Sequence, residues 1–217
     1  MNINAVVFDM DGVIFDSERL VVDCWKETAN KYGIKGVEEA CKECLGLNRQ
    51  ASKEKWLLRY GADFPYDAYK QEMSDLYHKR AREGALCMKL GVVELLSFLK
   101  EGGVKVALAS STREQVVTWQ LTQAGIIDYF EKIVCGDMVT NSKPHPEIFL
   151  KACEQLQVVP AETFAIEDSY NGIRAAYAAN MKPIMVPDMA EPTAEMKELS
   201  EVILPSLLHV IEYMRGL

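Results

Sequence analysis

Short apolar runs alternate with helical patterns over most of the chain. The first run, residues 3–8, is apolar except for one asparagine and ends at an aspartate, which is typical of a buried strand. Similar runs predict five more strands, at residues 104–109, 132–135, 163–166, 183–186 and 202–204. Strands that alternate with helices along the chain indicate a parallel, doubly wound α/β sheet.

Apolar residues at helical spacing predict the elements that join these strands. The predicted helices cover residues 92–100, 113–124, 146–156 and 169–180, with one more at the C-terminus. Gly125 directly follows the second of them, which is a common residue at a helix end. Pro146 opens the third, and proline is well tolerated in the first turn of a helix.

The block between residues 17 and 84 has a different pattern. Its apolar residues recur at helical spacing throughout, and glycines separate the periodic segments. The pattern predicts four helices and no strand, with helices at residues 17–32, 37–45, 49–60 and 66–83. We therefore expect a Rossmann-like core of residues 1–16 and 85–217, with a small all-helical domain, residues 17–84, inserted after the first strand.

Composition and charge narrow the possible functions. The chain has 217 residues, 49% of them apolar, which suits a globular core with a smaller insert. Its 24 Lys and Arg against 32 Asp and Glu give a net charge of −8, which disfavours nucleic-acid binding. No apolar run approaches a membrane span, and the first residues do not resemble a signal peptide. We therefore expect a cytoplasmic protein without a membrane segment, and a monomer because no feature indicates an obligate partner.

Six cysteines occur, and we interpret them as reduced thiols because no export signal precedes them. Cys41 and Cys44 form the one closely spaced pair. A structural zinc site needs four ligands, and no second pair or nearby histidine completes one. The pair is either two neighbours on a helix or a metal or redox site, and the lack of further ligands favours the first.

Polar and charged residues follow successive predicted strands. They are Asp9 and Asp11 after the first strand, Ser110 after the second, Lys143 in the loop after the third, and Glu167 and Asp168 after the fourth. The carboxyl ends of parallel strands meet at one edge of a sheet, so we expect these side chains to converge. Four carboxylates at one place repel one another, and a divalent cation offsets that repulsion. Oxygen ligands favour a hard ion, of which Mg²⁺ is the usual one.

Each of these residues suits a role in phosphoryl transfer. Asp9 can attack phosphorus to give an aspartyl phosphate, and Asp11 can protonate the leaving oxygen and later deprotonate a water. Ser110 can donate a hydrogen bond to a phosphoryl oxygen, and Lys143 supplies positive charge. Gly12 lets the backbone come close to a substrate and leaves its N–H free. Taken singly, each residue has a structural alternative, such as a turn or a helix cap, but their order after successive strands favours catalysis.

Four sequence segments combine these residues. They are residues 8–18 (FDMDGVIFDSE), 108–111 (LASS), 142–146 (SKPHP) and 166–169 (IEDS). Together they resemble the haloacid dehalogenase superfamily of phosphotransferases, in its β-phosphoglucomutase-like branch, and the resemblance covers essentially the whole chain. It implies Asp9 as the nucleophile and Asp11 as the acid/base. It also implies Mg²⁺ held by the Asp9 carboxylate, the Asp11 backbone carbonyl and Asp168, with Glu167 beside the ion or linked to it through water.

The helical insert resembles the small cap domain of that superfamily, which implies that it selects the substrate. Asn48 and Arg49 fall in a segment similar to the cap loop of relatives. Arg49 either grips a phosphate or sugar oxygen or is a solvated residue at the start of a helix. Ser111, Thr112 and Arg113, directly after the second segment, are placed to bind a distal polar group.

Three departures from the mutases of this branch bear on the reaction. Those mutases carry a histidine on the first cap helix, a lysine before the cap glycine and an asparagine after the second segment, where this chain has Val21, Leu45 and Glu114. A mutase must shield its aspartyl phosphate from water, so the loss of these polar groups favours hydrolysis. We predict a Mg²⁺-dependent phosphatase of a small phosphorylated metabolite, of the sugar phosphate or nucleoside monophosphate type, with a phosphomutase as the alternative.

Two further alternatives belong to other classes of protein. A receiver-type phospho-acceptor signalling domain also combines aspartates, Mg²⁺, a hydroxyl residue and a lysine on an α/β sheet. Such domains lack both an inserted cap and an acid/base at the position of Asp11, so this alternative is less favoured. A non-catalytic phosphate-binding protein ranks last because every catalytic position is filled.

Overall fold

The computed structural model describes residues 3–44 and 49–217. The chain divides into two compact units, one formed by Met1–Phe15 with Met88–Leu217 and the other by Asp16–Cys87. We call them the core unit and the helical unit. The predicted domain boundaries fall after residue 16 and after residue 84, close to these divisions.

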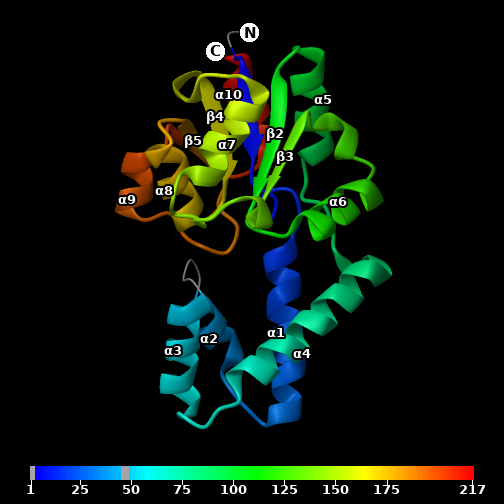
Figure 1. Cartoon of the computed structure of the whole chain (residues 1–217), viewed down its shortest axis with the longest axis vertical. Helices are drawn as coiled ribbons and strands as arrows, with labels where there is room; N and C mark the ends of the chain where they lie inside the picture. Colours follow the sequence, from blue (N-terminus) through cyan, green and yellow to red (C-terminus); the bar gives the residue numbers. More distant parts are fainter. Residues whose placement is uncertain (1–2, 45–48) are drawn as a thin grey trace. The chain divides into compact units, whose positions relative to one another are not determined.

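A six-stranded parallel sheet forms the centre of the core unit, in the order β3-β2-β1-β4-β5-β6 (Figure 1). The strands are β1 (Ala5–Phe8), β2 (Lys105–Ser110), β3 (Lys132–Cys135), β4 (Thr163–Glu167), β5 (Lys182–Met185) and β6 (Val202–Ile203). Phe8 at the end of β1 lies opposite Leu108 of β2 and Ile166 of β4. The chain builds outward from β1 on one side and then crosses over to β4, so a topological switch point lies at the carboxyl ends of β1 and β4. The predicted α/β fold class is confirmed.

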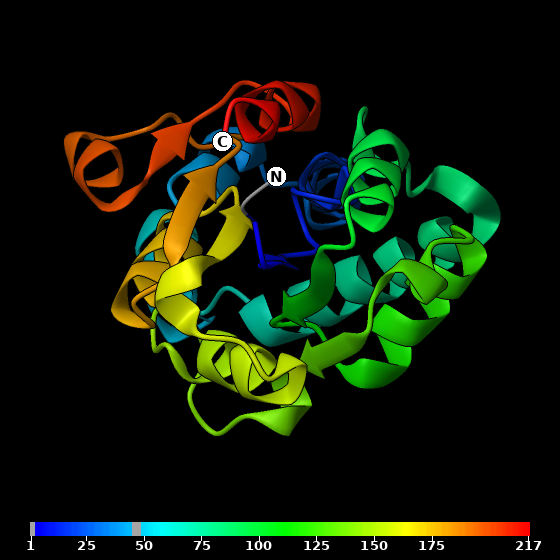
Figure 2. The same ribbon diagram turned by 90° about the horizontal axis from the view of Figure 1, so that it is seen from above.

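Helices cover both faces of this sheet (Figure 2). On one face, α7 (Glu147–Leu156) packs against β1, β2 and β3, and α8 (Tyr170–Ala178) packs against β4 and β5. Further helices belong to the core unit. The helix α5 (Val92–Glu101) contacts β2, and α6 (Glu114–Gln123) contacts β3. The last helix, α10 (Leu207–Arg215), packs against α5. Buried alanines of β1, β2 and β4 lie in the cluster that contains Phe149 and Leu156 of α7. Small strand residues thus leave room for the large side chains of that helix.

One helix of the core unit is not predicted by the hydrophobic pattern. It is α9 (Ala194–Leu199), which begins at Thr193, whose hydroxyl accepts a hydrogen bond from the Met196 N–H. Met196 is its one buried residue, so the segment is too short to show a helical period. Three 3₁₀ turns also occur in the described part of the core unit, at Ile127–Tyr129, Gly136–Met138 and Pro160–Glu162.

The described residues of the helical unit form the predicted helices and no strand. The helices are α1 (Ser17–Tyr32), α2 (Val37–Lys42), α3 (Arg49–Tyr60) and α4 (Tyr66–Arg80), and a π-helical turn at Ala81–Ala85 follows α4. The second helix ends at Lys42 rather than at residue 45, and residues 45–48 lie outside the described part of the chain. After Lys42 the chain closes a tighter turn, in which the Cys44 N–H donates to the Cys41 carbonyl.

Aromatic side chains form the interior of the helical unit. The Trp25 and Trp56 rings are stacked, with 4.6 Å between their centroids, and the Tyr69 ring lies 4.9 Å from Trp25. The Tyr69 hydroxyl donates a 2.7 Å hydrogen bond to the Trp25 carbonyl, so its polar end is satisfied within the cluster. The unit therefore has an aromatic core of its own.

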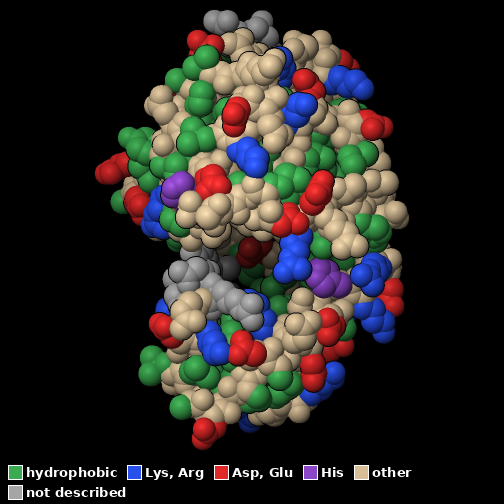
Figure 3. Space-filling model, in the orientation of Figure 1, with side chains coloured by type: hydrophobic (Ala, Val, Ile, Leu, Met, Phe, Trp, Pro, Cys, Tyr) green, Lys and Arg blue, Asp and Glu red, His purple; other side chains and the backbone are tan. Residues whose placement is uncertain are grey.

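Two surface features bear on possible partners. On the face seen in Figure 3, lysine and arginine side chains are interspersed with aspartate and glutamate side chains. In residues 3–44 and 49–217, no helix has both the length and the apolar character that crossing a bilayer requires.

The Trp56 side chain provides a test of the aromatic core. Trp56 is 2% exposed, so Trp56→Ala should lower the free energy of unfolding of the helical unit by about 3–5 kcal/mol. Leu58 on the same helix is 89% exposed, so Leu58→Ala should change it by less than about 0.5 kcal/mol. Urea unfolding followed by far-UV circular dichroism measures both variants. Equal effects would show that Trp56 does not stabilise this unit.

Candidate active site

Asp9 is positioned directly by the sheet. Its N–H donates a 2.9 Å hydrogen bond to the Ile166 carbonyl, which continues the pairing of β1 with β4 by one residue. The side chain is buried, with 7% exposure. Because Asp9 follows the central strand at the switch point, its carboxylate lies where the ends of β2 and β4 converge.

Gly12 lies in the turn after Asp9, and its neighbours explain why this residue is glycine. Its φ of +81° favours glycine, and a Cβ there would lie 2.2 Å from the Asp168 Oδ2. The prediction that the Gly12 N–H is free for a substrate is wrong, because that group donates to the Phe15 carbonyl at 2.9 Å. The turn folds back so that the Phe15 carbonyl oxygen accepts the hydrogen bond of the Gly12 N–H. Gly12 therefore permits the close approach of Asp168.

Three buried carboxylates meet at the switch point. Ligand oxygens of Asp9, Glu167 and Asp168 all lie within 4.8 Å of one another. Glu167 is 1% exposed and Asp168 is 6% exposed. Like charges this close and this far from water repel strongly, so the cluster needs positive charge.

Lys143 supplies one positive charge. Its Nζ lies 2.5 Å from the Asp9 Oδ1, 2.7 Å from the Glu167 Oε1 and 3.0 Å from the Ala109 carbonyl oxygen, so each of its three N–H groups has an acceptor. Burial opposes the charge on Lys143, but the two carboxylates outweigh burial and raise the pKa of the ammonium above its ordinary value. Burial raises the pKa of Asp9 to about 8, against the lowering effect of Lys143.

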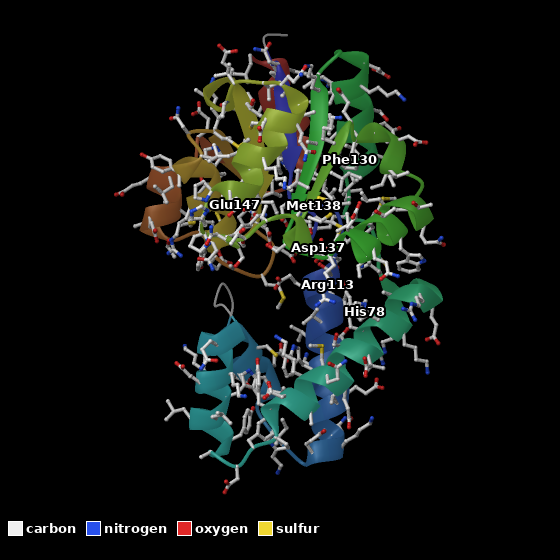
Figure 4. All side chains as sticks on the ribbon, viewed as in Figure 1. His78, Arg113, Phe130, Asp137, Met138 and Glu147 are labelled. Carbon is white, nitrogen blue, oxygen red and sulfur yellow. The ribbon has the colours of Figure 1, made fainter. Side chains whose placement is uncertain are left out.

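The loop that carries Lys143 is anchored by Glu147 of α7 (Figure 4). The Glu147 carboxylate accepts hydrogen bonds from the backbone N–H of Thr140 at 2.7 Å and of Asn141 at 2.8 Å. These bonds hold the pKa of Glu147 below its usual value. The sequence did not predict this role, although a glutamate in the first turn of a helix beside a polar loop is a recognisable signal.

Both carboxylate oxygens of Glu167 accept hydrogen bonds from groups of the protein. Its Oε2 accepts from the Asp168 N–H at 3.0 Å and from the Ser169 N–H and hydroxyl at 2.9 Å each, while its Oε1 contacts Lys143. The Ser169 hydroxyl also accepts from the Gly172 N–H and so caps α8. Glu167 thus holds the lysine and the turn after β4, which fits a place beside a metal ion better than direct ligation.

Ser110 and Asp11 are linked through Thr112. The Ser110 side chain is fully buried, and its hydroxyl accepts a 3.1 Å hydrogen bond from the Thr112 N–H. The Thr112 hydroxyl in turn donates to the Asp11 Oδ2 at 2.9 Å. The Asp11 carboxylate therefore turns toward β2 and is not among the three that cluster. The sequence did not predict this contact.

The remaining predicted ligand-binding residues are divided between the two units. Ser111 and Arg113 are exposed in the turn before α6, at the end of the sheet where Asp137 also lies (Figure 4). The Asp137 Oδ1 accepts from the Glu114 N–H and so caps α6. Asn48 lies outside the described residues, and so does the side chain of Arg49, the residue at which α3 begins.

The Cys41 and Cys44 side chains lie in the helical unit as free, half-buried thiols. Burial raises the pKa of Cys41 to about 12 and also raises that of Cys44. Both groups are therefore protonated at neutral pH, and the thiolate that metal binding or disulfide chemistry requires is disfavoured.

Comparison with known proteins identifies the family. A family model described as haloacid dehalogenase-like hydrolase matches residues 6–186. This span runs from β1 to the residue after β5 and contains the acidic cluster, Lys143 and the inserted helical unit. The chain belongs to the haloacid dehalogenase-like hydrolases. The resemblance inferred from the four sequence segments is thereby confirmed, as is the prediction that the chain is an enzyme of this superfamily.

Several members of the haloacid dehalogenase-like family are similar over most of their length. A phosphorylated carbohydrates phosphatase of Thermotoga maritima is 33% identical over 180 residues, which are 83% of each chain. A β-phosphoglucomutase of Bacillus subtilis is 37% identical over 186 residues, 82% of this chain and 80% of that one. A crystal structure from Thermotoga maritima, described as a candidate β-phosphoglucomutase, superposes with a TM-score of 0.81 at 28% identity and covers 99% of this chain and 100% of its own.

The donor set of this haloacid dehalogenase-like hydrolase fits a divalent cation. Lys143 contacts two of the three buried carboxylates, Asp9 and Glu167, and the third, Asp168, lies within reach of both. All side-chain donors are oxygens, which hard cations prefer to soft ones. Glu167 accepts three hydrogen bonds at Oε2 and contacts Lys143 at Oε1, which disfavours direct contact between its carboxylate and an ion.

Gly172 makes the buried position of Glu167 possible. A Cβ at residue 172 would lie 1.8 Å from the Glu167 carboxylate, so Gly172→Ala should displace that side chain and destabilise the core unit by about 1–3 kcal/mol. Gly216→Ala is the matched control, because its Cβ would come no nearer than 3.4 Å to the Tyr213 carbonyl oxygen. Thermal unfolding of the two variants measures the difference, and an unchanged melting temperature for Gly172→Ala would contradict this packing.

Proposed function

We propose that this protein is a Mg²⁺-dependent phosphatase that hydrolyses a small phosphorylated metabolite, preferentially a phosphorylated carbohydrate. The observation that carries the proposal is the buried Asp9 carboxylate, held by Lys143 beside Glu167 and Asp168 at the switch point. A carboxylate fixed in this way cannot turn away from a substrate. It is therefore prepared to act as a nucleophile at one defined place.

The first step transfers the phosphoryl group to Asp9. An Asp9 carboxylate oxygen attacks phosphorus and forms a new P–O bond, while the bond between phosphorus and the ester oxygen breaks. Asp11 gives its proton to the departing oxygen, which leaves as an alcohol. The Ser110 hydroxyl is placed to donate to a phosphoryl oxygen, and Lys143 offsets the negative charge around the nucleophile.

The second step releases phosphate. Asp11, now ionised, takes a proton from a water molecule as the water oxygen attacks phosphorus. The bond between phosphorus and the Asp9 oxygen breaks, which regenerates the Asp9 carboxylate and the protonated Asp11. The net reaction consumes one phosphate ester and one water and yields an alcohol and inorganic phosphate.

The metal site supports the same proposal. Asp9, Asp168 and the backbone carbonyl of Asp11 would hold Mg²⁺, with Glu167 beside the ion. When bound, the ion would neutralise charge on the phosphoryl oxygens and on the carboxylates. Such an ion would add positive charge to three clustered carboxylates, which would favour the approach of an anionic substrate.

The helical unit is proposed to act as the cap that selects the substrate. It is inserted directly after the turn that carries Asp11, and a pocket of about 230 Å³ lies within it. Val21 lines that pocket at the position where the mutases of the branch carry a histidine, and Glu18, Ser52 and Lys70 provide polar groups. Asn48 and Arg49 belong to the same proposed substrate-selecting region.

The comparisons support hydrolysis of sugar phosphates, and a phosphomutase remains the second candidate function. One relative is a phosphorylated carbohydrates phosphatase, and another is a β-phosphoglucomutase. The apolar Val21 favours the phosphatase, because a mutase needs polar groups over its aspartyl phosphate. Membership of a hydrolase family disfavours the receiver-type signalling domain.

Phosphate release from a panel of phosphorylated metabolites tests the reaction. With Mg²⁺, the wild-type protein should release inorganic phosphate from at least one sugar phosphate. Asp9→Asn should lower the rate by about 10³-fold or more, because an amide oxygen is a poor nucleophile. Asp128→Asn, the same change at an exposed carboxylate, should leave the rate unchanged. An isomerised sugar phosphate formed with a bisphosphate activator, in place of free phosphate, would identify a mutase.

Metal binding can be tested without turnover. At a Mg²⁺ concentration of about 100 times its dissociation constant, the ion should stabilise the folded protein by about 2.7 kcal/mol. Asp168→Asn should lose this increment, because it removes a proposed ligand, while Asp128→Asn should keep it. Thermal unfolding with and without Mg²⁺ measures the effect. Equal stabilisation of wild type and Asp168→Asn would exclude Asp168 as a ligand.

A further inference from the structure

We propose that Thr112 is the positioning residue for Asp11, fixing the orientation in which the Asp11 carboxyl group meets the leaving group. The proposal rests on the proposed phosphatase function. It is based on the 2.9 Å hydrogen bond from the Thr112 hydroxyl to the Asp11 Oδ2. Because Oδ2 accepts this hydrogen bond, Oδ1 is the oxygen of Asp11 that is turned away from Thr112.

Every polar group of Thr112 has a defined partner. Its N–H donates to the Ser110 hydroxyl oxygen at 3.1 Å, and its carbonyl accepts from the Gly136 N–H at 2.9 Å. The backbone is therefore fixed on both sides of the side chain. On this fixed backbone the Thr112 hydroxyl donates to the Asp11 Oδ2.

The turn that carries Thr112 is closely packed against the end of β3. A Cβ at Gly136 would lie 2.1 Å from the Ser111 carbonyl oxygen, so the two backbones are in direct contact there. Asp137 next to it accepts from the Glu114 N–H at the start of α6. The turn is thus confined between β3 and α6, and it cannot shift outward to release Asp11.

The backbone of Asp11 is fixed as well, which leaves its side-chain torsions as the main freedom. The Gly12 N–H donates to the Phe15 carbonyl, and the Phe15 N–H donates to the Met10 carbonyl. The Asp11 side chain is half-buried and separate from the three clustered carboxylates. The Thr112 hydroxyl therefore sets the remaining orientation. A general acid that is misplaced by about 1 Å can lose about 10²-fold in rate.

The effect should depend on the leaving group of the substrate. A poor leaving group needs its oxygen protonated as the bond breaks, whereas a good one departs as the anion. Thr112→Val removes the hydroxyl and keeps the shape of the side chain. It should lower kcat for phenyl phosphate by about 10–100-fold, with little effect on 2,4-dinitrophenyl phosphate and on KM. Thr112→Ser keeps the hydroxyl and should restore most of the rate.

Thr122→Val is the matched control. The Thr122 hydroxyl is exposed on α6 and bonds the Thr118 carbonyl of its own helix, so this change should leave both substrates unaffected. Equal losses for the two aryl phosphates in Thr112→Val would overturn the proposal and indicate a merely structural role. A raised KM with unchanged kcat would also overturn it, because that result assigns Thr112 to substrate binding, the role its sequence position suggests.

Crystal structures of wild type and Thr112→Val give a readout that needs no turnover. The Asp11 carboxylate should have one orientation in the wild type, with Oδ2 at hydrogen-bond distance from Thr112, and a different or divided orientation in the variant. An unchanged orientation would refute the positioning role. Failure of the phosphatase proposal would be seen separately, as the absence of phosphate release by the wild-type protein from every ester.

Discussion

Lys143 joins two buried carboxylates, Asp9 and Glu167, that would otherwise repel one another at the carboxyl ends of β1 and β4. Removing charges from water is costly, and the cost is offset only when each charge has close partners of good geometry. Here every N–H of the lysine has an acceptor, and Glu147 fixes the loop that delivers it. The remaining groups of the site are arranged around this ion pair, which fixes the direction of the Asp9 carboxylate.

The acidic cluster is tolerated because backbone groups and glycines surround it. Glu167 accepts three hydrogen bonds from the turn after β4. These donors stabilise the negative charge of its carboxylate. Gly172 and Gly12 are required by the carboxylates themselves, because a Cβ at either place would collide with Glu167 or Asp168. A side chain at residue 172, on α8, would displace a carboxylate of the cluster, and one at residue 12 would in addition be strained by its φ of +81°.

The proposed chemistry and the proposed substrate selection belong to different units of the chain. The core unit contains the described groups proposed for chemistry, and it is stabilised by helices packed on both faces of a parallel sheet. The helical unit has its own aromatic interior around Trp25 and Trp56, so its helices do not depend on the sheet for a core. Such an arrangement lets the residues proposed to select the substrate change without disturbing Asp9 or its partners.

The sequence by itself determined the strands, the helical insert and three of the four carboxylates predicted to converge, while the fourth, Asp11, lies apart from the cluster. Apolar runs reveal strands buried on both faces, and parallel strands bring their ends together, so Asp9, Ser110, Lys143 and Asp168 could be placed at one site from their order alone. Tertiary structure decided the partners of the Gly12 N–H, of Asp11 and of Glu147, and the short helix α9. The contact of Asp11 with Thr112 joins residues about a hundred positions apart. Such contacts depend on ångström-scale distances between loops, and hydrophobic periodicity reports burial rather than distance.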